Sequence, residues 1–305
     1  MSKILITGSA GYLGRVLYPM LQEKYEVVGM DNFLYGQGNV GALHGDITSL
    51  KDMYNFTKGI DVVVALAGIV GDPACGLDEE MTRIINFEST KLLADVCEAN
   101  KVKKLIFASS CSVYGASKEA RTVRCKTNPL SLYAQTKLDS ENIILERCKI
   151  CQPIILRFGT LFGYSPRMRF DLVANIMTAM AVKEGKVVVN GGDQWRPMVH
   201  VQDVAKRIRN IILFNQEPKK ENVVGKNYKI REIANVISEI TGAKIIENNE
   251  NRDERDYVAL YYLEDFEPLT LEDGVKEIIE HFKAGEFENY KDNKYYNVRI
   301  LEQLK

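Results

Sequence analysis

The sequence has few of the residue types that mark special classes of protein. Its 305 residues include only eight prolines, 22 glycines, three histidines and one tryptophan, while 46% of the residues are hydrophobic. Collagen-like chains need far more glycine and proline, and disordered chains have a much lower apolar content, so both classes are excluded. A chain of this length suits one large α/β unit with a smaller appended lobe.

An excess of charge of one sign is also absent. The chain has 40 basic and 41 acidic side chains, which gives a net charge of −1 at pH 7. Proteins that bind nucleic acids usually carry a basic surplus or a basic stripe. We therefore expect no nucleic-acid partner, and the balanced charge indicates a small-molecule ligand.

Long apolar runs are missing as well. The run at 61–70, one of the longest, falls far short of the roughly 20 residues that a membrane-spanning helix needs. The first residues, Met1-Ser-Lys-Ile-Leu-Ile-Thr7, pass directly into a strand-like pattern and leave no room for a signal peptide. We expect no membrane partner and a cytoplasmic location.

The few cysteines and histidines are widely spread and form no metal-binding motif. The cysteines stand at 75, 97, 111, 125, 148 and 151, and the histidines at 44, 200 and 281. The Cys148-x-x-Cys151 pair lacks the second pair or the nearby histidine that a zinc site would need. We expect reduced thiols in or near the core and no metal.

Short β-branched runs alternate with longer amphipathic runs through the first two-thirds of the sequence. The pattern predicts strands at 3–7, 26–30, 40–44, 62–66, 104–109 and 153–158. It predicts helices at 12–23, 50–57, 80–100 and 132–148. Strand–helix–strand alternation builds a parallel sheet that helices cover on both faces, so we expect a doubly wound α/β fold.

The regular alternation loosens after about residue 165. Helices at 172–182, 201–214 and 230–241 and a short strand at 186–189 are predicted there, followed by a tail rich in tyrosine and charge. We expect residues 1–165 to form the main unit and residues 166–305 to form a smaller C-terminal α/β lobe. Part of this lobe, at about 200–215, is expected to return to the main unit.

A glycine-rich turn links the first predicted strand to the first predicted helix. Its sequence is Thr7-Gly8-Ser-Ala-Gly11-Tyr12-Leu13-Gly14. Glycines here allow a tight bend, close approach of a diphosphate to the backbone, and close packing of the helix on the strand. The N-terminus of the helix then faces the phosphates with its partial positive charge. We therefore expect a dinucleotide bound on a Rossmann-type sheet.

Two acidic residues indicate which dinucleotide binds. Asp31 ends the second predicted strand, 20 residues after Gly11. A carboxylate at this place accepts hydrogen bonds from ribose hydroxyls and repels a 2′-phosphate, which predicts NAD rather than NADP. Asp46 follows the third predicted strand and is placed to bond the adenine amino group. The alternative for Asp46 is a turn or helix-capping role ahead of Ser49.

Tyr133 and Lys137 form a candidate catalytic pair. Their i, i+4 spacing puts both side chains on one face of the helix predicted at 132–148. A free tyrosine has a pKa of about 10, but a neighbouring ammonium and a cationic nicotinamide ring both stabilise the phenolate. Tyr133 would then act as the base, while Lys137 also holds the nicotinamide ribose.

Three motifs together resemble the extended short-chain dehydrogenase/reductase family, the NAD-dependent nucleotide-sugar epimerases and dehydratases. They are the Gly8-x-x-Gly11-x-x-Gly14 turn, the Tyr133-x-x-x-Lys137 pair and the segment Ser109-Ser-Cys-Ser-Val-Tyr-Gly115. The resemblance covers 3 to about 276. It implies that Ser110 is the catalytic serine, whose hydroxyl bonds the reacting sugar oxygen beside Tyr133; the alternative is that these serines only cap the strand. The implied cofactor contacts are Gly8, Gly11, Tyr12, Leu13, Gly14, Asp31, Asn32, Asp46, Ile47, Leu66, Ala67, Gly68, Asn86, Ser109, Tyr133, Lys137 and Phe158.

The two positions after Ser110 bear on the type of reaction. The 4,6-dehydratases of this family carry an Asp-Glu pair there, whereas this sequence has Cys111 and Ser112. Neither is a carboxylic acid, so a dehydratase is disfavoured. An epimerase-reductase with Cys111 as acid or base is an alternative, but that type also uses a histidine after the sixth strand, and 158–164 contains none. The other interpretation of Cys111 is a small, buried, structural thiol.

Four arginines are candidates for binding a nucleotide diphosphate, because arginine offers bidentate hydrogen bonds to phosphate. Arg167, Arg169, Arg196 and Arg255 stand in segments that resemble those of the family, and the alternative for each is a surface arginine. Thr160 stands where galactose epimerases have an asparagine that contacts the substrate. The implied substrate-binding residues are Ser110, Cys111, Ser112, Thr160, Arg167, Arg169, Arg196 and Arg255.

The sequence therefore predicts an NAD-dependent enzyme that oxidises the C4 hydroxyl of a nucleotide diphosphate sugar through Ser110, Tyr133 and Lys137. Hydride can return to the opposite face, as in an epimerase, or leave to another acceptor, as in a dehydrogenase. The rival hypotheses are a 4-keto-sugar reductase, which Asp31 disfavours, and a non-catalytic NAD-binding protein, which the Tyr133–Lys137 pair disfavours.

Two finer expectations also come from the resemblance. Phrases such as Ile69-Val-Gly-Asp-Pro-Ala-Cys75 and Thr270-Leu-Glu-Asp-Gly274 resemble a branch that includes a GDP-heptose C4-dehydrogenase of capsule synthesis. The family commonly dimerises through the helices that correspond to 80–100 and 132–148, so we expect a homodimer.

Overall fold

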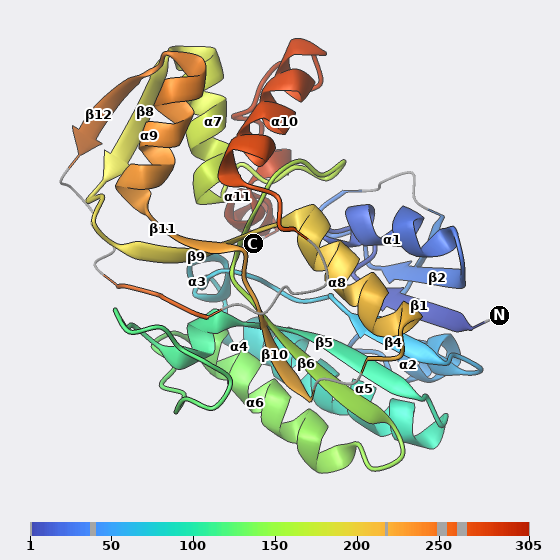
Figure 1. The fold of residues 1–305 in the computed structure, drawn as a ribbon. Helices are drawn as coiled ribbons and strands as arrows, with labels where there is room; N and C mark the ends of the chain where they lie inside the picture. The colour runs from blue at the N-terminus through green and yellow to red at the C-terminus, as the bar shows by residue number, and fades with distance from the viewer. Residues whose placement is uncertain (1, 37–40, 217–218, 249–254, 261–266, 305) are drawn as a thin grey trace.

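Seven parallel strands form the main sheet (Figure 1). The computed structural model describes residues 2–36, 41–216, 219–248, 255–260 and 267–304. The strands are β1 (Lys3–Thr7), β2 (Glu26–Asp31), β3 (Ala42–His44), β4 (Val62–Ala65), β5 (Lys104–Ser110), β6 (Gln152–Phe158) and β10 (Lys220–Val223). Their order is β10-β6-β5-β4-β1-β2-β3, so the winding reverses between β1 and β4. The doubly wound α/β fold that the alternation predicts is confirmed.

Helices cover both faces of this sheet because successive strand residues point to opposite sides. Ile4 and Ile6 of β1 pack with α1 and α8 on one face, whereas Leu5 packs with α2, α5 and α6 on the other. None of the helices in the described ranges is long and apolar enough to cross a membrane. The helices on the sheet are α1 (Gly14–Gln22), α2 (Leu50–Thr57), α5 (Ser89–Ala99), α6 (Leu132–Arg147) and α8 (Val201–Leu213).

The helix predicted at 80–100 is confirmed as one continuous helical run over 79–99, but the run contains a π-helical turn that was not predicted. α4 covers Glu79–Arg83, a π-helical turn covers Ile84–Glu88, and α5 follows from Ser89. A π-helical turn inserts an extra residue and re-aims the side chains around it. Hydrophobic periodicity does not show such an insertion, so the π-helical turn was not predictable from the pattern. Similarly, the helix predicted from residue 12 begins at Gly14.

Residues from Thr160 onward build most of a smaller α/β part, which lies above the main sheet in Figure 1. It contains a three-stranded sheet in the order β11-β9-β7 and a parallel pair, β12-β8. The sequence predicted only the β8 strand and two of the helices, α7 and α9, so most of this part was missed. The elements are β7 (Thr160–Phe162), β8 (Lys186–Asn190), β9 (Trp195–His200), β11 (Lys226–Lys229), β12 (Lys244–Asn248), α7 (Val173–Glu184), α9 (Ile230–Thr241), α10 (Leu271–Lys283) and α11 (Asn297–Glu302).

The chain returns to the main sheet after entering the smaller part. α8 packs against α1, and β10 pairs in parallel with β6 at the edge of the seven-stranded sheet. The two parts are therefore interleaved along the sequence. A functional division at about residue 165 stays a proposal.

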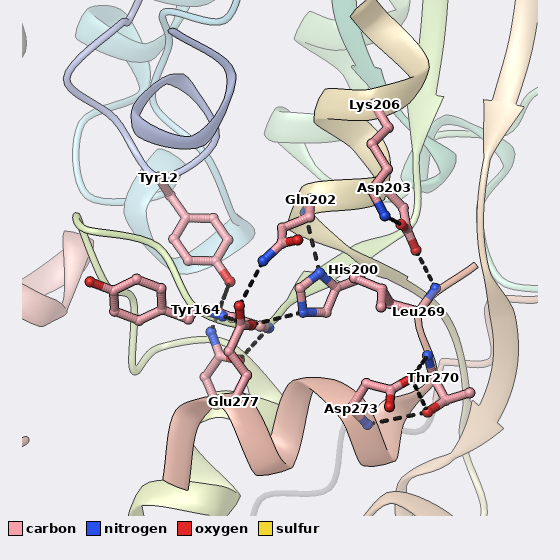
Figure 2. A network of polar contacts seen from close by, with 12 residues as sticks. Tyr12, Tyr164, His200, Gln202, Asp203, Lys206, Leu269, Thr270, Asp273 and Glu277 are labelled. Atoms are coloured by element: carbon pink, nitrogen blue, oxygen red, sulfur yellow. Dashed lines mark hydrogen bonds and ion pairs between the residues drawn. The ribbon is translucent and has the colours of Figure 1, made fainter. Parts of the chain in front are cut away.

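A buried polar network joins the smaller part to the glycine-rich turn and to α8 (Figure 2). Glu277 of α10 accepts hydrogen bonds from the Tyr164 backbone N–H at 2.9 Å and from Gln202 Nε2 at 2.7 Å, and lies 3.1 Å from His200 Nε2. His200 Nδ1 in turn accepts from the Gln202 backbone N–H, so His200 caps α8. The Tyr12 hydroxyl donates to the Gly163 carbonyl at 2.6 Å. These bonds fix the turn between β1 and α1 against the β7–α7 loop.

Candidate active site

One cavity of about 760 Å³ lies at the carboxyl ends of the central strands, where the winding reverses. Ligands of doubly wound folds bind at this point, and the volume falls in the roughly 300–1,000 Å³ range of small-molecule sites. Every site residue predicted from the sequence lines this cavity except Asn86. The structure therefore brings the two predicted sets, for the cofactor and for the substrate, into one continuous space.

The glycine-rich turn is packed too closely for side chains at two of its positions. Gly8 has a φ of +74°, and a Cβ there would lie 2.7 Å from the Ala67 backbone nitrogen. A Cβ on Gly14 would lie 2.4 Å from the Gly8 carbonyl oxygen. These contacts agree with the predicted tight bend and close helix packing. The turn therefore has little freedom to move where it lines the cavity at the start of α1.

The Asp31 carboxylate holds the glycine-rich turn from the end of β2. Its two oxygens accept hydrogen bonds from the Ala10 backbone N–H at 3.0 Å and the Phe33 backbone N–H at 2.8 Å. Burial raises the pKa of Asp31 above its ordinary value, although these bonds oppose the shift. A carboxylate has about four acceptor sites, so acceptors remain for ribose hydroxyls.

Asp46 has the turn role that was the alternative to binding adenine. Its Oδ1 accepts from the Thr48 backbone N–H and from Thr48 Oγ1, both at 2.8 Å. Ser49, not Asp46, caps α2 by accepting from the Asp52 backbone N–H. Asp46 still lines the cavity, so its turn role and a contact with adenine are compatible.

Ser110, Tyr133 and Lys137 meet in the cavity from two neighbouring elements. Ser110 ends β5, and Tyr133 and Lys137 lie in α6, which Ser131 caps by accepting from the Ala134 backbone N–H at 3.2 Å. Ser110, Tyr133 and Lys137 all line the same cavity. Lys137 Nζ lies 5.9 Å from the centre of the Tyr133 ring and donates to the Ala108 carbonyl at 2.8 Å.

The pKa shifts of Tyr133 and Lys137 differ from the prediction that Lys137 stabilises a Tyr133 phenolate. Burial raises the pKa of Tyr133 above its ordinary value, and this effect outweighs the hydrogen bond with Ser110. Burial also lowers the pKa of Lys137 to about 8. Desolvation disfavours both charged forms, and Lys137 is bonded to a backbone carbonyl rather than to the phenol. In the protein alone, Tyr133 therefore keeps its proton.

Cys111 and Ser112 follow Ser110 in a short 3₁₀ turn. The Cys111 thiol is buried, donates to the Arg157 carbonyl at 3.4 Å, and has a pKa raised to about 12 by burial. Ser112 donates from both its backbone N–H and its hydroxyl to Ser110 Oγ, at 3.1 Å and 2.9 Å. The thiol is thus held in its neutral form, and Ser112 directs the Ser110 hydroxyl.

Asn86 is the one predicted cofactor residue that the structure places behind the cavity wall. Its side-chain amide accepts from the Ile69 backbone N–H and donates to the Ile69 carbonyl, both at 2.9 Å. Both ends of the amide are therefore used within the protein. Asn86 therefore positions the segment after β4 and is not among the residues that line the cavity, so a direct cofactor contact stays a prediction.

The arginines predicted to bind substrate fall into two groups. Arg255 donates to Asp72 at 2.8 Å, and Arg196 donates to the Arg255 carbonyl at 2.6 Å, with both guanidinium groups lying over the Tyr257 ring. Arg167 and Arg169 lie instead beside Tyr35. Tyr35 belongs to the segment that follows β2. Thr160, at the start of β7, lines the cavity.

Several residues that line the cavity were missed by the sequence reasoning. Tyr35 lies in the loop after β2, and Asp72 begins the short helix α3 (Asp72–Cys75). Asn297 and Leu301 come from α11, a six-residue helix without an extended periodic pattern. Asp72 alone had a readable signal, because Gly71-Asp72-Pro73 is typical of a helix start.

The sequence and the fold were compared with known proteins. The model of the NAD dependent epimerase/dehydratase family matches residues 4–228. The chain is 26% identical over 270 residues to the uncharacterized UDP-glucose epimerase YtcB of Bacillus subtilis, which covers 79% of this chain and 83% of that protein. Protein CapI of Staphylococcus aureus is 28% identical over 248 residues, 72% of each chain.

Solved structures share the fold at low sequence identity. The UDP-glucuronic acid 4-epimerase from Bacillus cereus, solved with UDP-glucuronic acid and NAD, superposes with a TM-score of 0.80 at 24% identity. The match covers 92% of this chain and 99% of that one. These comparisons do not test the resemblance to the GDP-heptose branch, which stays a prediction.

Proposed function

The chain belongs to the NAD dependent epimerase/dehydratase family, and from this premise we propose that it oxidises the C4 hydroxyl of a nucleotide diphosphate sugar. The family identifies the chain as an enzyme and NAD as its cofactor. We assign the chemistry to Ser110, Tyr133 and Lys137. The observation that carries the proposal is that these three side chains share one cavity with the glycine-rich turn and with Arg196 and Arg255.

The residues around the cavity fit a dinucleotide. The three glycines of the turn from Gly8 to Gly14 line the cavity at the start of α1, which suits a diphosphate. The Asp31 carboxylate lies at the end of β2 and retains acceptor capacity for ribose hydroxyls. Lys137 uses one N–H on the Ala108 carbonyl and has two more for the nicotinamide ribose.

The bonding of Ser110 supports its role in holding the reacting oxygen. Its Oγ accepts from the backbone N–H and the hydroxyl of Ser112, which occupies the acceptor positions of a serine hydroxyl. The Ser110 proton is then directed outward, to Tyr133 or to the sugar oxygen. Tyr133 takes the proton of the C4 hydroxyl as the carbonyl forms.

NAD, when bound, supplies the hydride acceptor for the C4–H bond. Its positive ring also favours the phenolate, which the buried environment of Tyr133 disfavours in the protein alone. Bound NAD would thus help Tyr133 to act as the base.

The alternative chemistries receive less support from the site. An epimerase-reductase that relies on Cys111 needs a thiol that can exchange its proton, whereas burial raises the pKa of Cys111 to about 12 and its Sγ faces the Arg157 carbonyl. An elimination of water needs a carboxylic acid next to Ser110, and this chain has Cys111 and Ser112 there. Epimerisation and net dehydrogenation both stay open, and we propose a homodimer through α5 and α6.

Replacing Tyr133 by phenylalanine tests the proposal. The variant removes the proton acceptor and keeps the ring, so we expect turnover to fall by about 100-fold or more while NAD still binds. Wild type and variant are incubated with NAD and with UDP-, GDP-, CDP- and dTDP-sugars, and NADH absorbance and product mass are followed. Full turnover by Tyr133→Phe would refute the assignment, and NADH accumulation in the wild type would separate a dehydrogenase from an epimerase.

A further inference from the structure

Arg167 lines the cavity, and its guanidinium has an unsatisfied hydrogen-bond donor among the described residues. Its Nη2 donates to the Asn297 side-chain oxygen at 2.6 Å, and its guanidinium lies 4.7 Å from the centre of the Tyr35 ring. Arg167 Nε and the Tyr35 hydroxyl are both buried and have no hydrogen-bond partner among the described residues. Both atoms are shielded from the cavity, whereas Arg167 and Tyr35 as residues line it, so a ligand would contact the accessible part of the guanidinium.

The neighbouring arginine differs in this respect. Arg169 forms a bidentate pair with Asp171 through Nε and Nη2, at 2.9 Å and 3.0 Å. Arg167 has only the neutral Asn297 amide as a side-chain hydrogen-bond partner among the described residues. Burial, together with the charge of Arg169, lowers the pKa of Arg167 to about 10. An anion beside Arg167 would offset the free-energy cost of burying this cation.

The segment that carries Asn297 is held firmly against the cavity. The Phe170 backbone N–H donates to the Tyr295 carbonyl at 3.1 Å, and the Asn297 backbone N–H donates to Asp171 at 3.2 Å. Leu301 of α11 is buried against Ile69 and Cys75, next to the segment after β4. Asn297 itself is 2% exposed. α11 therefore forms part of the wall and fixes the direction of the Arg167 side chain.

The position of Arg167 favours the cofactor side of the cavity. Tyr35 follows β2 directly, and the Arg167 charge acts on Asp31, the residue proposed for the cofactor ribose. Arg196 and Arg255 lie apart from this group, with Asp72 and Tyr257. The diphosphate of a dinucleotide bound on this fold lies at the N-terminus of the first helix, close to the residues that hold the ribose.

We propose that Arg167, oriented by Asn297 and Tyr35, binds the diphosphate of the cofactor rather than that of the sugar nucleotide. The proposal rests on the proposed use of NAD. It changes the assignment that the family resemblance gives to Arg167, and it makes α11 a part of the cofactor site. The diphosphate would accept charge-assisted hydrogen bonds from the part of the Arg167 guanidinium that lines the cavity.

Binding measurements on the whole chain test this proposal. The affinities of NAD, ADP-ribose, adenosine and UDP are measured by calorimetry for the wild type and for Arg167→Met. We expect the variant to bind NAD and ADP-ribose about 10- to 100-fold more weakly, and adenosine and UDP as the wild type does. Asn297→Ala should weaken NAD binding by a smaller factor, since the guanidinium remains but is less well oriented.

Arg299→Met is the matched control. Arg299 also lies in α11, but it stacks on Tyr296 and donates to the Lys291 carbonyl, away from the cavity. This variant should bind NAD as the wild type does, and thermal unfolding shows whether each variant is folded. Unchanged NAD affinity in a folded Arg167→Met, or a loss confined to UDP, would overturn the proposal. If the wild type binds neither NAD nor ADP-ribose, the proposed function fails together with the inference.

Discussion

The ammonium group of Lys137 is buried between the main sheet and α6, and burial lowers its pKa to about 8. The unfolded chain therefore binds more protons than the folded chain between about pH 8 and pH 10.5, so this residue makes stability rise with pH in that window. Below pH 8 the full cost of burying the charge is present. The proposed role of Lys137 beside the cofactor accounts for this cost.

Replacing Lys137 by methionine should therefore stabilise the protein near neutral pH. We expect the free energy of unfolding to increase by about 1–3 kcal/mol at pH 7, reduced by the lost bond to the Ala108 carbonyl. The gain should shrink as the pH rises from 8 to 10.5. Urea unfolding at several pH values measures it, and Lys276→Met, at an exposed position, is the control. A gain that does not depend on pH would mean that packing, not charge, is responsible.

Single residues of the site were predictable where they follow strands with a clear pattern. Gly8, Asp31 and Ser110 each come at the carboxyl end of a strand, and the ends of parallel strands meet at one edge. Tyr35 and Asn297 come from a loop and a short helix, which carry no periodic signal. Their positions depend on how the smaller part packs over the sheet, and one sequence does not contain that information in readable form.

At the scale of elements, α10 depends on a glycine that helix propensity alone would disfavour. Gly274 lies inside α10, and a Cβ there would lie 2.6 Å from the Phe162 ring and 3.0 Å from the His200 ring. These rings contact each other edge to face, with centroids 5.1 Å apart. The close approach of α10 to β7 and β9 therefore requires a residue without a side chain.

Gly274→Ala should destabilise the protein although alanine is the better helix former. The gain in helix propensity is about 1 kcal/mol, whereas overpacking of this kind typically costs about 1–3 kcal/mol and here displaces two aromatic rings. We expect a net loss of stability in urea unfolding. Lys276→Ala, two residues further along the same helix and exposed, should change stability by less than about 0.5 kcal/mol. A stabilised Gly274→Ala variant would contradict the close packing of α10.

The elements of the smaller part show why hydrophobic patterns did not predict all helices and strands. α10 has a readable start, the capping box of Thr270 and Asp273, which the sequence reasoning overlooked. β11 is Lys-Asn-Tyr-Lys, and β9 contains Arg196 and Pro197, so neither resembles a buried strand. These strands form because neighbours supply hydrogen bonds, whereas β1 and β4 can be recognised by their apolar residues alone.

At the scale of the whole molecule, Glu277 joins three elements that are distant in the sequence (Figure 2). Burial opposes the ionisation of Glu277, but the hydrogen bonds from His200 and from the Tyr164 backbone outweigh it and lower its pKa. A carboxylate with a lowered pKa contributes stability above its unfolded value, and the contribution is lost as the pH falls. The connection between the smaller part and α8 is therefore strongest near neutral pH.

Glu277→Gln should weaken this connection. The amide group places a donor against the Tyr164 N–H or His200, so we expect a loss of about 1–3 kcal/mol at pH 7 that shrinks below about pH 4. Thermal and urea unfolding measure the loss. Glu280→Gln, whose carboxylate pairs with exposed Lys283, should cost less than about 1 kcal/mol. Equal effects of the two substitutions would show that the network does not connect the two parts.

The position of β10 at the edge of the main sheet has a consequence for synthesis of the chain. β6 ends at Phe158, but its partner β10 is complete only at Val223. At roughly 5–20 residues per second, a ribosome needs about 3–13 seconds to add the 65 residues between these points. During that interval β6 presents unpaired backbone groups and the apolar residues Ile154 and Leu156, a combination that recruits other strands. Nascent chains on neighbouring ribosomes thus have a few seconds in which to pair with one another through an edge that the finished enzyme has covered.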